Sequence, residues 1–100
     1  MTKTDKKSMS NMSKWDKEAK EKEWKIVHES DTDNGKPTCW ALEINHKIYG
    51  KYVWITGLLD YDEETIVQYN VEVIPDKDAR ILVECKSLAS AKRWVAMNLL

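Results

Sequence analysis

An alternation of apolar and polar side chains constrains the fold of this chain more than any other feature of its sequence. The clearest run covers residues 65–74, in which valine and tyrosine alternate with glutamine, asparagine and glutamate. Side chains two residues apart lie on the same side of a β-strand, so this run predicts a strand with one buried side. Four further strands are predicted at residues 24–30, 38–45, 48–56 and 80–85.

Short polar segments separate the predicted strands. Asn34-Gly35 is the pair most typical of a hairpin turn, because both residues tolerate positive φ. Residues 45–47 and 75–78 are further turn candidates, and residues 57–64 form a loop with an acidic tip. Strands joined by short connections usually pair with their neighbours in sequence. The sequence therefore predicts an antiparallel meander of four to five strands.

The segment before the meander predicts a tail and then a helix. Residues 1–11 lack apolar anchors, so we expect a flexible tail there. Ser13 and Asp16 have the spacing of a capping pair at a helix start. The helix that follows carries only a thin apolar stripe, which includes Trp15 and Ala19. A helix this polar is expected to stay mostly solvated and to dock by one edge.

The segment after the meander predicts a second helix, with Ser87 as its N-cap. Its apolar residues recur at helical spacing on one side: Leu88, Ala91, Val95 and Leu99. We expect Lys92, Arg93 and Ala96 to face away from that side. A continuous apolar side must be buried, so the predicted role of this helix is to close the core.

The predicted fold class is therefore α+β, with an N-terminal helix, an antiparallel β-meander of four to five strands, and a C-terminal helix packed on one sheet face. Residues 12–100 are expected to form a single domain. The chain of 100 residues has 42% hydrophobic and 33% charged residues and a formal net charge of −1. Neither a secretory leader nor an apolar run of membrane-spanning length is recognisable, so we expect a cytoplasmic protein without a membrane partner. In that compartment Cys39 and Cys85 are predicted to be free thiols.

The residues that usually carry catalysis or bind metals do not occur here at the required spacings. The two histidines and two cysteines form no close pair of the kind that structural zinc sites use. The acids of Asp31–Gly35 do not fit a calcium loop, because glycine occupies the fifth position rather than the sixth. Nucleophile-elbow, phosphate-loop and metalloprotease motifs are also missing. We therefore predict a protein that is not an enzyme and has no cofactor and no metal.

The predicted strand at residues 48–56 is apolar or aromatic on both sides, with Ile48, Tyr52 and Trp54 on one side. A single C-terminal helix can cover only one side of a sheet. The other side is covered by the N-terminal helix, by a second subunit, or left as an exposed aromatic patch, and such patches often mark interaction sites. The candidate partner-binding residues are Tyr49, Tyr52, Trp54, Trp40 and Lys51.

These features predict a small non-enzymatic cytoplasmic binding protein that acts on another protein, either as a monomer or as a homodimer. Short, highly charged chains of this kind are typical of the accessory and inhibitor proteins that phages and mobile elements encode. The alternative is a nucleic-acid-binding module that uses the basic residues Lys6, Lys7, Lys14, Lys92 and Arg93. A third possibility is self-assembly through an exposed sheet edge.

Overall fold

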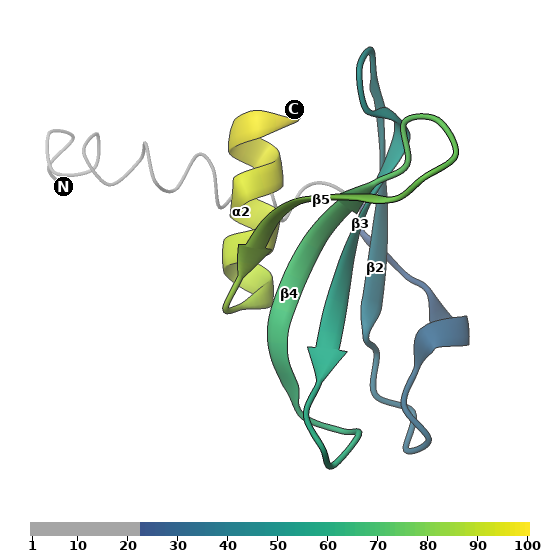
Figure 1. Ribbon diagram of the computed structural model, residues 1–100, viewed down its shortest axis with the longest axis vertical. Helices are drawn as coiled ribbons and strands as arrows, with labels where there is room; N and C mark the ends of the chain where they lie inside the picture. Colours follow the sequence, from purple (N-terminus) through teal and green to yellow (C-terminus); the bar gives the residue numbers. More distant parts are fainter. Residues whose placement is uncertain (1–22) are drawn as a thin grey trace, which may run out of the picture.

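The computed structural model describes residues 23–100, which form one antiparallel sheet followed by a C-terminal helix (Figure 1). The strands are β1 (Lys25–Ile26), β2 (Cys39–His46), β3 (Gly50–Leu59), β4 (Ile66–Val73) and β5 (Arg80–Cys85), and they lie in sequence order. The helix α2 spans Leu88–Asn98. The predicted antiparallel meander and C-terminal helix are confirmed, whereas the predicted N-terminal tail and helix lie outside the described residues.

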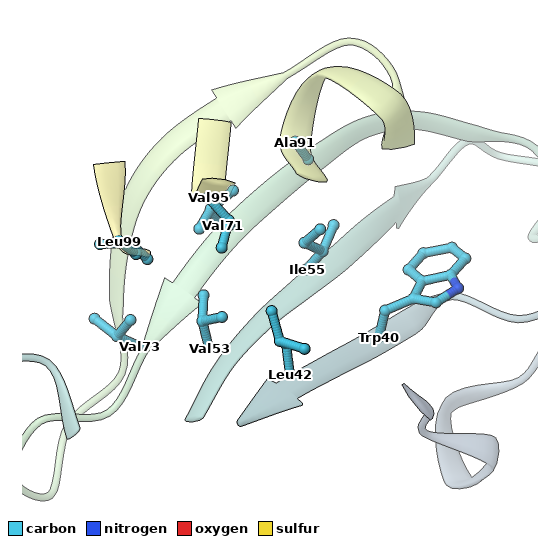
Figure 2. Close-up of a cluster of buried hydrophobic side chains, with 9 residues drawn as sticks. All are labelled: Trp40, Leu42, Val53, Ile55, Val71, Val73, Ala91, Val95 and Leu99. Carbon is cyan, nitrogen blue, oxygen red and sulfur yellow. The ribbon is translucent and has the colours of Figure 1, made fainter. Parts of the chain in front are cut away.

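The core lies between α2 and one face of the sheet (Figure 2). Its nine buried side chains are Trp40, Leu42, Val53, Ile55, Val71 and Val73 from the sheet and Ala91, Val95 and Leu99 from α2. The six sheet residues form two rows of directly opposed neighbours across β2, β3 and β4. Alternation within each strand and pairing between strands therefore produce one apolar face, as the sequence predicts.

Helix α2 begins where its sequence predicts. The Ser87 side chain accepts a hydrogen bond from the Ser90 backbone N–H at 3.0 Å, which satisfies one of the free donors of the first turn. The predicted apolar side faces the sheet. Ala96 was expected to face away, yet it is only 1% exposed. It lies three residues before Leu99, on the adjacent row of the helix, so the buried sector of α2 is wider than the predicted stripe.

The first strand is much shorter than the predicted run of residues 24–30. Only Lys25–Ile26 pairs with β2, and a 3-10 turn follows at His28–Ser30. Pro37, in the returning segment, has no backbone N–H to donate to a strand ladder, which explains why pairing ends here. The hairpin turn nevertheless lies where it was predicted, and Gly35, with φ of 81°, donates its backbone N–H to the Thr32 carbonyl at 2.8 Å.

Irregular pairing changes the side to which some residues point. A register shift between Val71 and Glu72 places Ile81 opposite Glu72, away from the core, where it is 53% exposed. Regular alternation within residues 80–85 predicts that Ile81 shares the side of Val83, and this is wrong because a β-bulge inserts one extra residue and reverses the alternation. A second shift near Leu58 accompanies the exposure of Val67, which was expected to point inward.

Candidate interaction face

The side of the sheet opposite α2 is defined here as the open face. Figure 1 shows α2 on one side of the curved sheet, alongside β4 and β5. Among residues 23–100, α2 is the only α-helix, so no second α-helix of this part of the chain covers the open face. The pairing register fixes the middle row of the open face, which consists of Ala41, Trp54, Glu72 and Ile81.

Two aromatic side chains occupy the centre of the open face. Tyr52 and Trp54 are two residues apart in β3, and they therefore point to the same side. Their ring centroids lie 5.9 Å apart with an interplanar angle of 45°. Tyr52 is 38% exposed and Trp54 is half-buried. The two rings therefore pack against each other, and both remain partly accessible to solvent and to a ligand.

A glutamate is the pairing partner of each of these aromatic residues on a neighbouring strand. Glu43 of β2 is paired with Tyr52, and Glu72 of β4 is paired with Trp54. Side chains of directly opposed residues on one face have Cβ atoms about 5 Å apart. The aromatic pair is therefore flanked by one acidic side chain from each neighbouring strand.

The acidic side chains of this face are not neutralised within the described part of the chain. Glu43 accepts a hydrogen bond from the Asn45 side-chain amide at 3.0 Å, but no Lys or Arg of residues 23–100 forms an ion pair with Glu43 or Glu72. Glu84 adds a third carboxylate opposite Asn70. Lys25, opposite Ala41, brings one positive charge to the edge of the face.

Beside the aromatic pair, the next row of the open face is small and polar. Cys39, Thr56 and Asn70 are directly opposed across β2, β3 and β4. Asn70 is buried, and its side-chain oxygen accepts a hydrogen bond from the Gln68 amide at 2.8 Å. Burial raises the pKa of the Cys39 thiol, so the thiolate that would act as a nucleophile is disfavoured. This row supports the sheet rather than offering a reactive group.

Both cysteines are free, as predicted. Cys39 belongs to the open face, whereas Cys85 is paired with Tyr69 on the side of the core. Burial also raises the pKa of the Cys85 thiol. Two thiols on opposite sides of the sheet cannot reach each other through it.

The structure separates the five predicted partner-binding residues. Tyr52 and Trp54 lie together on the open face, and Lys51 precedes Tyr52 in β3, with its Nζ 5.4 Å from the centre of the Tyr52 ring. Trp40 instead is a core residue, 8% exposed, with its ring 6.0 Å from that of Tyr69. Tyr49 packs against the edge of the core, 4.9 Å from the His46 ring.

Glu43 and Glu72 were not among the predicted partner-binding residues. The alternation in residues 65–74 already placed Glu72 on the outward side of its strand. Its position beside Trp54, however, depends on the register between β3 and β4, which the alternation within one strand does not specify.

Only two of the five basic residues of the nucleic-acid alternative, Lys92 and Arg93, lie in the described part of the chain. Lys6, Lys7 and Lys14 lie outside residues 23–100. Lys92 is half-buried, its Nζ lies 6.0 Å from the centre of the Trp24 ring, and burial lowers its pKa. Arg93 is also half-buried. Lys92 and Arg93 were expected on the solvated side of the helix, but both side chains are half-buried.

The acidic loop between β3 and β4 has a structural role in this geometry. Asp62 accepts hydrogen bonds from the Glu64 and Thr65 backbone N–H groups and from the Thr65 hydroxyl. These bonds lower the pKa of Asp62 to about 2. Glu64 accepts a hydrogen bond from the Asn34 amide, which joins the loop to the turn before β2. No group of three or more histidine, cysteine or acidic residues within residues 23–100 is placed to hold a metal ion.

Comparison with known proteins gives no assignment, since no family model, curated protein or solved structure matches the chain. The interpretation of the open face therefore depends on its own geometry. No helix within residues 23–100 is both long enough and apolar enough to cross a bilayer.

Proposed function

We propose that this protein is a small non-enzymatic binding module that binds another protein through the open face. The observation that carries the proposal is the Tyr52–Trp54 pair, which lies in a central strand and on the side that α2 leaves open. Tyrosine and tryptophan are enriched at interface hot spots because they bury a large area with little loss of side-chain entropy.

Two exposed apolar side chains lie further out on the open face, beyond Thr56 in one direction and beyond Glu72 in the other. Leu58, which lies opposite Gln68, is exposed toward one end of β3. Ile81 is exposed on β5, on the same row as Trp54. Aromatic anchors surrounded by polar groups are typical of a protein interface.

The charge of the open face favours a protein over a nucleic acid as the partner. Glu43, Glu72 and Glu84 would repel phosphate groups, and phosphate contacts supply most of the affinity of nucleic-acid binders. An accessory or inhibitor role in the cytoplasm, acting through such a face, is part of the same proposal.

The proposal is tested by capturing partners from the native host with the wild-type chain and with two matched variants. Trp54→Ala should abolish capture while leaving the circular dichroism spectrum unchanged. Tyr61→Ala is the control, because Tyr61 is a fully exposed aromatic residue in the loop between β3 and β4. The proposal fails if Trp54→Ala unfolds the chain, or if capture is equally affected by Tyr61→Ala.

The nucleic-acid alternative gives the opposite pattern in the same assay. Reversing the charges with Lys92→Glu and Arg93→Glu would then remove binding, and salt would weaken the wild-type complex steeply. Under the proposed function this double variant keeps its partner, and the partner survives nuclease treatment.

A further inference from the structure

The proposed function leaves the chemistry of the partner open, and the central part of the open face restricts that chemistry. Two aromatic and two glutamate residues are neighbours there, as Glu43 is directly opposite Tyr52 and Glu72 is directly opposite Trp54. The acidic groups approach the aromatic pair from β2 on one side and from β4 on the other. A group that packs against this pair would therefore have a glutamate on each neighbouring strand.

All four groups favour a cation. The face of an aromatic ring carries negative potential and attracts cations within about 6 Å of the ring centre. The chain itself shows this at its rim, where the Lys51 Nζ lies 5.4 Å from the centre of the Tyr52 ring. The carboxylates of Glu43 and Glu72 add full negative charges that no Lys or Arg of residues 23–100 pairs with.

Among biological cations, the guanidinium group of arginine matches this arrangement best. It is planar, so it stacks on aromatic rings, and its donors bind a carboxylate in a bidentate manner. An ammonium group is more strongly hydrated and makes only point contacts. Lys25 lies at the edge of the face, opposite Ala41, and Lys51 precedes Tyr52 in β3, and neither lysine forms an ion pair with Glu43 or Glu72.

We infer that the open face binds an arginine-bearing basic segment of a partner protein, with an arginine side chain against Tyr52 and Trp54 and its charge met by Glu43 and Glu72. This inference rests on the proposed function, because it names the chemistry of the partner for that same face. It commits to a basic protein segment; a second copy of the chain and a single-stranded RNA are alternative occupants that the experiment separates.

The experiment is an NMR titration that follows the Trp54 indole N–H, assigned with a Trp54→Phe variant. The probe is a synthetic nine-residue peptide with two arginines among glycine and serine, and its control is the same peptide with citrulline in place of arginine. Citrulline keeps the planar shape and lacks the charge. We expect the arginine peptide to shift the indole resonance saturably, and the citrulline peptide to leave it in place.

Two matched double variants then locate the charges that matter. Glu43→Gln with Glu72→Gln should weaken binding of the arginine peptide about tenfold, since two partly exposed ion pairs are lost. Glu29→Gln with Glu63→Gln changes the net charge equally, at exposed positions in the 3-10 turn after β1 and in the loop between β3 and β4, outside the strands that form the open face. This control should change the dissociation constant less than twofold. All four substitutions keep the side-chain shape, so the folded amide spectrum should persist.

Four outcomes would overturn the inference. They are an equal response to the citrulline peptide, an equal loss in both double variants, an indole shift that grows with protein concentration alone, and a larger shift with single-stranded RNA than with the arginine peptide. The test is distinguishable from that of the proposed function. If Trp54→Ala abolishes capture of a host protein but Glu43→Gln with Glu72→Gln does not weaken it, the inference fails and the proposed function stands. If Trp54→Ala leaves capture unchanged, both fail.

Discussion

Val95 offers the sharpest test of how the chain is held together. Its side chain is fully buried between α2 and the sheet, close to Val71 and Leu99 in the core (Figure 2). Val95→Ala removes two methyl groups, and at about 0.8 kcal/mol per buried carbon the transfer term is about 1.6 kcal/mol. The cavity that remains raises the expected loss to about 2–3 kcal/mol, and the better helix propensity of alanine offsets about 0.5 kcal/mol of it.

Val95→Asp should do more than weaken the fold. An unpaired carboxylate in this apolar contact costs several kcal/mol, which is comparable with the total stability of about 5–15 kcal/mol that small domains have. We expect this variant to be unfolded at 25 °C.

The assay is urea denaturation followed by circular dichroism, with Met97→Ala and Met97→Asp as matched controls. Met97 is on the same helix and is 51% exposed. Both Met97 variants should stay within about 1 kcal/mol of wild type, because surface substitutions seldom cost more. If Val95→Ala is no more harmful than Met97→Ala, or if Val95→Asp folds normally, then α2 does not close the core and the argument is wrong.

Three further predictions concern separate parts of the sheet. Gly57→Ala should lower the free energy of unfolding in urea by about 1–3 kcal/mol, because an added Cβ would lie 2.8 Å from the Ile66 Cδ1 atom. The double variant Gly57→Ala with Ile66→Val lacks that Cδ1 atom and should recover part of the loss. The pKa of Asp62 is depressed to about 2 from an ordinary value of 3.8, so the contribution of this carboxylate to stability is complete above pH 4 and disappears as the pH falls through 2. The Thr65 amide resonance should therefore stay unchanged between pH 7 and pH 4. A change in that resonance centred above pH 4 would contradict this prediction. Reductant should leave the melting temperature unchanged, and Cys39→Ala should cost about 1 kcal/mol, because the thiol acts as a small buried apolar group.

The parts of the fold that follow from local pattern could be predicted from the sequence. Alternation placed Trp40 in phase with Leu42, and Val71 in phase with Val73, and all four are core residues. The same alternation indicates that Trp40 belongs to the core, where its side chain is 8% exposed. The strand side of a residue is a local property, because it needs only the distance in sequence from a buried neighbour.

The parts that depend on pairing between strands could not be predicted in this way. The bulge in β5 turns Ile81 outward, and no residue type within β5 signals that one position is skipped. The meeting of Glu72 with Trp54 likewise depends on the register of two strands that are joined by a six-residue loop. A shift of one residue would have moved Glu72 to the core side, so burial of its apolar neighbours selects the register only once the whole sheet forms.

Strand β3 serves two purposes at once, and this leads to a final prediction for residues 52–55. Val53 and Ile55 are fully buried beneath α2, whereas Tyr52 and Trp54 lie on the open face. An alanine scan should therefore give two complementary patterns with a period of two. Alanine at the two buried positions should cost about 2–4 kcal/mol of unfolding free energy. Alanine at the two aromatic positions should cost about 1 kcal/mol of stability through lost cross-strand contacts, yet weaken partner binding at least tenfold. Urea denaturation and capture of the host partner measure the two patterns separately, with binding assayed only under conditions in which each variant remains folded. If stability falls equally at all four positions, the open face is covered in the native protein and cannot be the binding surface.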